Sequence, residues 1–173
     1  MCGIIGFIGH NYGYNNVFDG LKMLLNRGYD SVGICGINLN GEELLLHKYA
    51  STDSSNSYDI LLEHKEKYSN INSPLISHSR WATHGPKNNI NAHPHLDNTG
   101  RFAIVHNGII ENYGEIKTYL SIEHNTKFIS QTDTEVIVNL ISVLYDKHKD
   151  VKLAMDEAFN MMIGSWAILM IHL

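Results

Sequence analysis

The residue most able to do chemistry in this sequence is Cys2, which follows the initiator Met1. A small second residue favours removal of the initiator methionine, and removal would give Cys2 a free α-amine. The pKa of an α-amine is about 7.7–8.0, so much of it is neutral near neutral pH. It can therefore act as the base toward the thiol of its own residue. The alternative is that Cys2 is a small buried hydrophobic residue at the start of a strand.

A second candidate is the dipeptide Asn107-Gly108, which follows an apolar run that predicts a strand. The Asn side-chain amide and the Gly backbone N–H can together donate to the charged oxygen of a tetrahedral intermediate. The same dipeptide is also the favoured two-residue turn of a β-hairpin. A plain turn at this position is therefore the alternative that needs no function.

Two charged residues are suited to hold an amino acid by its two ends. Arg80 ends a predicted strand, and its guanidinium can grip a carboxylate with two hydrogen bonds. Trp81 follows it and can close over a ligand, although an exposed Arg beside a partly buried Trp is equally ordinary. Asp133 lies at a predicted helix start, where it either binds an ammonium group or complements the helix dipole. Both roles are compatible, because Thr132 would cap the helix.

The histidines raise the question of a metal site, because His93-Pro94-His95 accompanies His78, His84 and His106. No Cys-x-x-Cys pair and no His-Glu-x-x-His helix accompanies them, so we expect no metal. The spaced glycines near the N-terminus do not match a dinucleotide-binding fingerprint in a strand-turn-helix context. The sequence therefore predicts no cofactor.

The elements that must position these residues form a mixed order. A long irregular stretch at 80–100 is rich in His, Asn and Pro, and such loops in compact domains are usually functional. Thr132 and Glu135 form a capping box at the start of the clearest helix. The mixed order indicates an α+β fold of packed layers. The hydrophobic periodicity predicts strands at 3–9, 32–38, 43–49, 74–79, 101–106 and 164–172, and helices at 14–25, 54–67, 109–120, 132–145 and 151–162.

Bulk composition excludes several classes of function. The 173 residues fit one domain, and 43% hydrophobic with 18% charged residues is typical of a soluble globular protein. A net charge of −5 argues against a nucleic-acid binder. The longest apolar run, 166–171, is too short to span a membrane, and the N-terminus does not resemble a signal peptide. We expect a cytoplasmic protein in which Cys2 and Cys35 stay reduced.

Taken together and in order, these motifs resemble the class II glutamine amidotransferases, whose N-terminal cysteine hydrolyses glutamine. Within that class the resemblance is to the glutaminase domain of the glutamine–fructose-6-phosphate aminotransferase family. Amidophosphoribosyltransferases typically carry Arg-Tyr-Ser-Thr at 80–83, and asparagine synthetases carry Asn-Gly-Glu at 107–109. The resemblance runs from Cys2 to about Gly164, and the motifs that carry it are 2–6, 27–31, 78–85, 91–95, 105–113 and 132–135.

The resemblance implies a four-layer αββα sandwich of the N-terminal-nucleophile hydrolase type, and a role for each motif residue. Cys2 would be the nucleophile, Asn107 and Gly108 the oxyanion hole, and Arg27 would support the region around Cys2. The residues implied to bind L-glutamine are Arg80, Trp81, Thr83, His84, Gly85 and Asp133.

The resemblance also implies that domain 1–173 is truncated at its C-terminal end, because Leu173 falls within a predicted strand. The sugar-isomerase domains of the family are absent, so this chain alone is not expected to aminate fructose 6-phosphate. Three interpretations remain open: the glutaminase part of glucosamine 6-phosphate synthesis, a glutaminase serving a different synthase, and a truncated fragment without activity. A separate sugar-isomerase or synthase chain and a homo-oligomer remain open as partners; nucleic acid and membrane are not expected.

Overall fold

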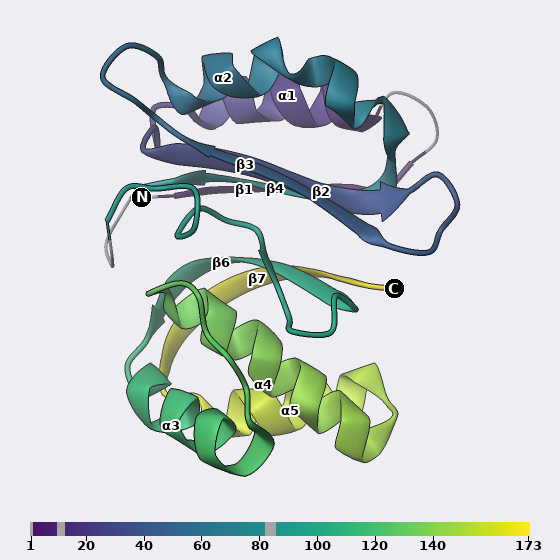
Figure 1. The fold of residues 1–173 in the computed structure, drawn as a ribbon, viewed down its shortest axis with the longest axis vertical. Helices are drawn as coiled ribbons and strands as arrows, with labels where there is room; N and C mark the ends of the chain where they lie inside the picture. Colours follow the sequence, from purple (N-terminus) through teal and green to yellow (C-terminus); the bar gives the residue numbers. More distant parts are fainter. Residues whose placement is uncertain (1, 10–12, 82–85) are drawn as a thin grey trace.

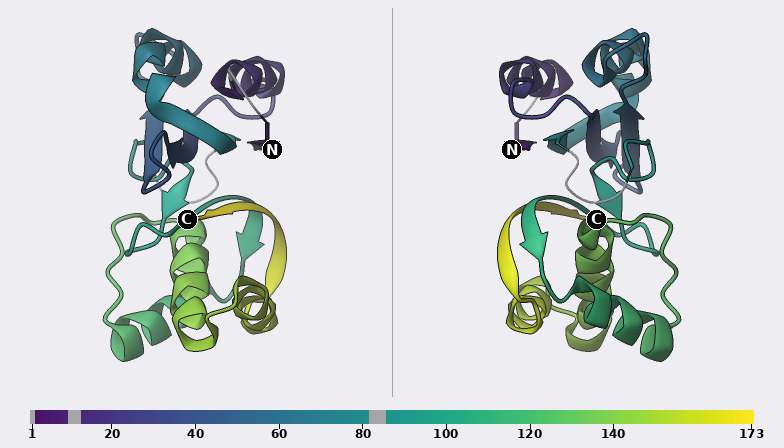
Figure 2. Two further views of the ribbon diagram at one scale, coloured as in Figure 1. Left: turned by 90° about the vertical axis from the view of Figure 1, so that its right-hand side faces the viewer. Right: turned by 90° about the vertical axis from the view of Figure 1, so that its left-hand side faces the viewer.

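Two antiparallel sheets lie face to face in the computed structural model, which describes residues 2–9, 13–81 and 86–173. Helices cover the outer face of each sheet, so four layers follow one another (Figures 1 and 2). The first sheet has the order β1 (Gly3–Phe7), β4 (Ile71–Arg80), β2 (Ser31–Asn38) and β3 (Leu44–Ala50). The second has the order β5 (His95–Leu96), β6 (Phe102–Ile110) and β7 (Gly164–His172). The four-layer αββα sandwich is confirmed.

The helices divide between the two sheets. Those covering the first sheet are α1 (Gly13–Leu24) and α2 (Ser57–Glu63), followed by the 3₁₀ helix η1 (Lys65–Asn70). Those covering the second sheet are α3 (Tyr113–His124), α4 (Asp133–His148) and α5 (Val151–Met161). Within the described part of the chain, no helix is long and apolar enough to cross a membrane.

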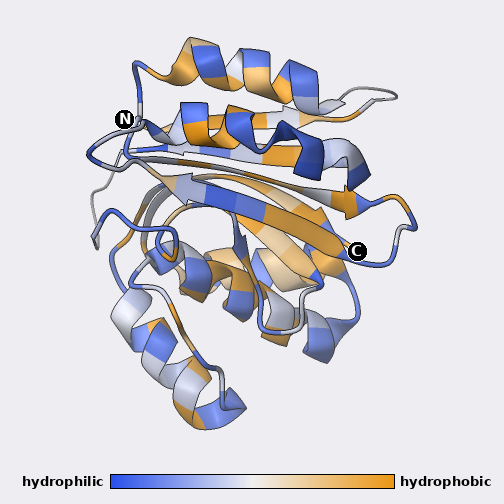
Figure 3. Cartoon of the chain, turned by 45° about the horizontal axis from the view of Figure 1, so that its top comes forward, coloured by the Kyte–Doolittle hydropathy of each residue, from blue (hydrophilic) through white to orange (hydrophobic). Residues whose placement is uncertain are grey.

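The buried apolar side chains of the described residues form three clusters, which lie between the four layers. One joins α1 and α2 to the first sheet, and another joins α3, α4 and α5 to the second. The third lies between the two sheets and includes Cys35, Ile76, Val105 and Ile171. Both sheets are therefore covered on both faces, and their strands carry apolar stretches that polar residues interrupt (Figure 3).

Local sequence accounts for most helix boundaries. The predicted helix at 14–25 is observed as α1, and Val17, Phe18 and Leu21 form its buried face. At the start of α4 the Oγ1 of Thr132 accepts the N–H of Glu135 at 3.4 Å, as predicted. The Glu135 carboxylate does not return this bond to Thr132, because it accepts from the N–H and hydroxyl of Ser130 instead.

The turn predicted at Asn107-Gly108 is wrong. Strand β6 continues through both residues to Ile110, and β7 pairs with it over this whole length. The helix predicted to begin at Ile109 begins at Tyr113 instead. Both residues pair with β7, which is distant in the sequence, instead of forming a local hairpin. Sequence periodicity does not reveal such a partner strand.

Two further boundaries differ from the predictions. The single helix predicted at 54–67 is split at His64 into α2 and η1. Strand β4 begins at Ile71 rather than Pro74, because a register irregularity opposite Gly36 and Ile37 leaves Pro74 outside the regular ladder. The short strand β5 lies inside the region predicted as an irregular loop.

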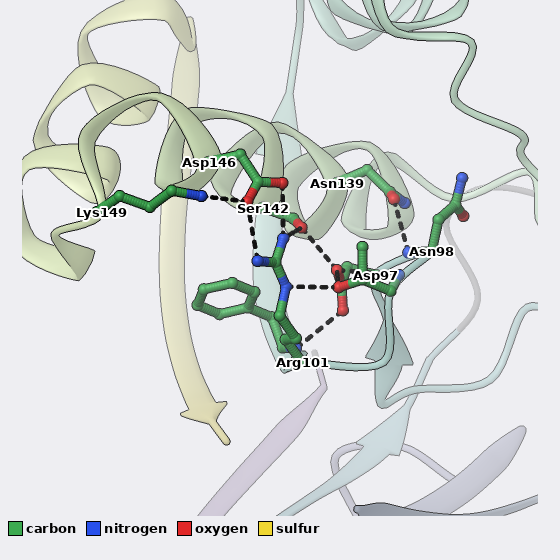
Figure 4. A network of polar contacts seen from close by, with 9 residues as sticks. Asp97, Asn98, Arg101, Asn139, Ser142, Asp146 and Lys149 are labelled. Atoms are coloured by element: carbon green, nitrogen blue, oxygen red, sulfur yellow. Dashed lines mark hydrogen bonds and ion pairs between the residues drawn. The ribbon is translucent and has the colours of Figure 1, made fainter.

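A polar network fixes the turn between β5 and β6 to α4 (Figure 4). The guanidinium of Arg101 donates two hydrogen bonds to Asp146, at 2.9 and 2.8 Å. The Asp97 carboxylate accepts from the hydroxyl of Ser142 at 2.6 Å and from the N–H of Phe102 at 2.9 Å. These bonds tie the residues just before β6, and its first residue Phe102, to one another and to α4.

Candidate active site

A cavity of about 440 Å³ opens between the two sheets at the ends of β4 and β6. It brings together every predicted site residue that the structure describes, from five separate motifs. They are Cys2, Arg27, Arg80, Trp81, Asn107, Gly108 and Asp133. The predicted ligands Thr83, His84 and Gly85 lie outside the described residues.

Strand pairing places the sulfur of Cys2 against the end of β4. Gly3 pairs with Ser79, so Cys2 lies opposite the residues that follow Ser79. The backbone N–H of Trp81 donates to Cys2 Sγ at 3.1 Å, and the carbonyl oxygen of Trp81 lies 3.4 Å from the same sulfur. Backbone atoms of a single residue, Trp81, therefore hold the Cys2 sulfur at the end of β4.

The second cysteine has the opposite environment. Cys35 is fully buried in the core between the sheets, and both cysteines are free. Burial raises the pKa of the Cys35 thiol to about 12, so it stays protonated. Of the two sulfurs, only Cys2 reaches the cavity.

Asn107 and Gly108 lie beside Cys2 because β6 faces β1 and β4 across the inter-sheet space. The side-chain amide of Asn107 donates to the backbone carbonyl of Cys2 at 3.1 Å. Gly108 has a φ of +139°, and a Cβ there would lie 2.0 Å from the carbonyl oxygen of Ser165. Only glycine fits this close approach of β7, and Gly108 also lines the cavity.

The cavity wall carries two opposite charges. Arg80 is buried, which lowers the pKa of its guanidinium, while the nearby Cys2, Asp30 and Asp133 act in the opposite direction. Asp133 is the first residue of α4, and its Oδ2 accepts the N–H of Ile110 at 3.0 Å. A positive and a negative group lining one cavity suit a zwitterion such as a free amino acid.

Trp81 lies at the rim of the cavity, with 45% of its surface exposed. Its ring packs edge-on against Tyr29, with centroids 5.5 Å apart. The neighbouring Asp30 forms an ion pair with Lys87 at 2.5 Å. Contacts from the 27–31 motif therefore reach both ends of the segment that runs from Trp81 to Lys87.

Several cavity-lining residues were not predicted as site residues. They are His93, His106, Ile109, Thr132, Thr134 and Ser165. His93 Nε2 lies 2.7 Å from Thr134 Oγ1, and His106 Nδ1 lies 3.1 Å from the same oxygen. In the sequence, His106 is a polar residue inside an otherwise apolar strand and His93 lies in the irregular loop, and that pattern indicates at most a metal site. Among the described residues, no group of three or more His, Cys, Asp or Glu side chains is arranged to hold a metal ion.

Comparison with known proteins identifies the family. A family described as "Glutamine amidotransferase domain" matches residues 64–163. The chain belongs to this family. It is 44% identical over 169 residues to glutamine–fructose-6-phosphate aminotransferase (isomerizing) of Oceanobacillus iheyensis, covering 97% of this chain and 26% of that protein. The enzyme of the same name from Helicobacter pylori is 40% identical, with 99% of this chain and 27% of that protein covered.

Solved structures agree on the fold of this amidotransferase domain. One is described as the allosteric regulatory enzyme of purine biosynthesis, with a TM-score of 0.80, 27% identity, and 99% of this chain and 35% of that one covered. The glutamine phosphoribosylpyrophosphate amidotransferase of B. subtilis gives a TM-score of 0.77 at 24% identity, with the same coverage. The chain spans about a quarter of the length of the aminotransferases that it matches.

Proposed function

We propose that this amidotransferase domain hydrolyses the side-chain amide of L-glutamine to glutamate and ammonia, with Cys2 as the nucleophile. The observation that carries the proposal is the single cavity in which Cys2, an amide donor and two opposite charges meet. Arg80 would bind the α-carboxylate and Asp133 the α-ammonium of glutamine, which leaves the side-chain amide to reach Cys2. Trp81, Thr83, His84 and Gly85 are proposed to complete the glutamine site.

The proposed reaction begins once Met1 is removed. The α-amine of Cys2 takes the thiol proton, and the sulfur bonds to the amide carbon of glutamine. Asn107 Nδ2 and the Gly108 N–H then stabilise the oxyanion. When the oxyanion collapses, the carbon–nitrogen bond breaks and the α-ammonium returns its proton to the leaving group, which departs as ammonia. Water then adds to the thioester, the carbon–sulfur bond breaks, and glutamate is released.

The supporting residues have narrower proposed roles. Arg27 lines the same cavity as Cys2 and is proposed to support the region around it. Cys2 must remain a free thiol to react, so we propose that the domain works in a reducing compartment such as the cytoplasm.

The names of the relatives support an acceptor for the ammonia. We propose that it reaches fructose 6-phosphate bound to a sugar-isomerase domain, so that the overall product is glucosamine 6-phosphate. That domain would be supplied by a partner or by further sequence of the same protein. Transfer of ¹⁵N from amide-labelled glutamine to the sugar, in the presence of such a domain, tests the acceptor.

Hydrolysis itself is tested with purified chain in which loss of Met1 has been confirmed by mass. We expect glutamate and ammonia from the processed chain, none above background from Cys2→Ala, and near-normal rates from Cys35→Ala. The Cys35 control is matched, because it removes a thiol that does not reach the cavity. Turnover by Cys2→Ala, or none by processed and folded wild type, would overturn the proposal.

A further inference from the structure

One buried side chain stands directly behind the proposed oxyanion hole. His78 lies on β4, is 1% exposed, and does not line the cavity. Its Nε2 is 3.0 Å from Oδ1 of Asn107, which lies on β6 of the opposite sheet. This contact therefore crosses the inter-sheet space and ends on the amide that is proposed to stabilise the oxyanion.

The direction of this hydrogen bond follows from a neighbouring one. The nitrogen of the Asn107 amide lies 3.1 Å from the backbone carbonyl of Cys2, and a carbonyl oxygen only accepts. Turning the amide over would set two oxygens against each other at that distance. Asn107 must therefore present its oxygen to His78, and His78 must donate from Nε2. The ring is then the tautomer with its proton on Nε2.

Fixing the oxygen of Asn107 fixes both of its N–H groups, because the amide is planar. One N–H is used by the Cys2 carbonyl, and the other remains for an oxyanion beside Cys2. The terminal torsion of Asn is intrinsically broad and roughly two-fold. Without a donor at His78 the amide would turn over more readily and offer an oxygen, which repels an oxyanion.

The His78 ring is itself held in place and kept neutral. It stacks on His93, with centroids 4.3 Å apart and planes 23° apart. His93 is in turn held by its 2.7 Å contact with the hydroxyl of Thr134. Burial lowers the pKa of His78 to about 4, although the hydrogen bond to Asn107 opposes this shift. At neutral pH the ring therefore carries one proton, as the hydrogen-bond geometry requires.

We propose that His78 is a positioning residue of the oxyanion hole, which acts by holding Asn107 with its amide nitrogen toward Cys2. This inference rests on the proposed glutaminase function. It assigns to His78 a task that hydrophobic packing alone could not perform, because the task requires a donor at one defined atom. A ring of similar size without nitrogen would keep the packing but could not donate a hydrogen bond to Asn107.

The kinetic test compares His78→Phe with His78→Gln. Phenylalanine keeps a ring against His93 but donates nothing, whereas the glutamine side chain can place an N–H close to the position of Nε2. Removing an oxyanion donor outright costs about 10²–10³ in kcat, so we expect Phe to lower kcat about 10–100-fold with little change in KM. We expect Gln to recover most of this loss. His47→Phe on β3 is the matched control, because His47 packs on Tyr68 away from the cavity.

Two further kinetic measurements separate positioning from general damage. Alkylation of Cys2 by iodoacetamide forms no tetrahedral oxyanion, so its rate should stay within about 2-fold in His78→Phe. The double variant His78→Phe/Asn107→Ala should have a kcat only slightly below that of Asn107→Ala alone, because both changes remove the same donor. Equal loss of alkylation and hydrolysis, full additivity, or no rescue by Gln would overturn the proposal.

A spectroscopic measurement decides the geometry even if the chain hydrolyses no glutamine. The ¹⁵N chemical shifts of His78, assigned by their loss in His78→Gln, report its tautomer and charge. We expect a neutral ring protonated on Nε2 at pH 7. A proton on Nδ1, or a doubly protonated ring, would overturn the positioning role. If the folded wild type shows the expected tautomer but hydrolyses no glutamine, the positioning of Asn107 by His78 stands. Only the proposed glutaminase function is then overturned.

Discussion

At the scale of single residues, the cavity brings two opposite charges, Arg80 and Asp133, to the same space. Arg80 comes from the end of β4 and Asp133 from the start of α4, so each is carried by a different sheet-and-helix layer. One oxygen of Asp133 is held by the N–H of Ile110, while the other lies 3.8 Å from Nδ1 of His106. The carboxylate is therefore fixed in orientation before any ligand arrives, which lowers the entropic cost of binding.

This arrangement predicts the effect of Asp133→Asn. The amide oxygen can still accept from Ile110, so the change removes the charge and little else. Hydrogen bonds to charged groups contribute about 1.5–3 kcal/mol, so we expect KM for glutamine to rise about 10–100-fold, with a smaller change in kcat. Steady-state kinetics measure this. Asp19→Asn on the exposed surface of α1 is the control, and an unchanged KM with reduced kcat would assign Asp133 to the chemical step instead.

At the scale of elements, the C-terminal end of strand β6 could not be predicted from the sequence. The pattern at 101–106 predicted a strand, and Asn107-Gly108 was interpreted as its end. The pairing of Asn107 with Ala167 and of Gly108 with Trp166 carries the strand four residues further. Those partners are almost 60 residues away in the sequence, so local propensity could not indicate them. The role proposed for the dipeptide depends on this extension, because it carries Asn107 and Gly108 to the cavity.

The same strand predicts an unequal response to two glycine substitutions. Gly108 combines a φ of +139° with a backbone oxygen 2.0 Å from the position of a Cβ. Strain and overpacking cost about 1–3 kcal/mol each, so Gly108→Ala should lower the free energy of unfolding by about 2–6 kcal/mol and abolish hydrolysis. Gly114→Ala in α3 is the control, because open space surrounds that position and alanine favours a helix.

Urea unfolding of the two glycine variants measures the difference. We expect Gly114→Ala to match or slightly exceed the wild type in stability. Equal stability of Gly108→Ala and wild type would show that β6 and β7 can separate locally, and that the close approach at Ser165 is not required.

At the scale of the whole molecule, the layer order followed from the family resemblance, whereas the inter-sheet interior did not. Periodicity predicted most elements correctly, because helices such as α1 and α5 bury residues at helical spacing. It did not reveal that His78, His93, His95 and His106 would gather between the sheets, since they come from three strands and a loop. In the sequence they suggested only a metal site, whereas the packing of β4, β5, β6 and the loop at His93 brings them together.

These four buried histidines predict how stability depends on pH. Burial is the main cause that lowers the pKa of each, to about 4 for His78 and well below the usual value for His93 and His95. The pKa of His106 is also lowered, although Asp133 opposes the shift. In the unfolded chain these groups titrate near 6.5. Between about pH 6.5 and 4 the unfolded state therefore binds more protons than the folded state, so stability falls as the pH falls.

The size of the effect can be checked with one substitution. Each histidine contributes up to about 1.4 kcal/mol per pH unit while only its unfolded form is protonated. For His78 the interval from 6.5 to about 4 corresponds to a loss of about 3 kcal/mol. Urea unfolding at several pH values measures the free energy of unfolding. Between about pH 6.5 and 4 it should fall less steeply for His78→Gln than for wild type, by up to about 1.4 kcal/mol per pH unit. Parallel curves would mean that the ring takes up a proton in the folded state, which would also remove the fixed tautomer that Asn107 requires.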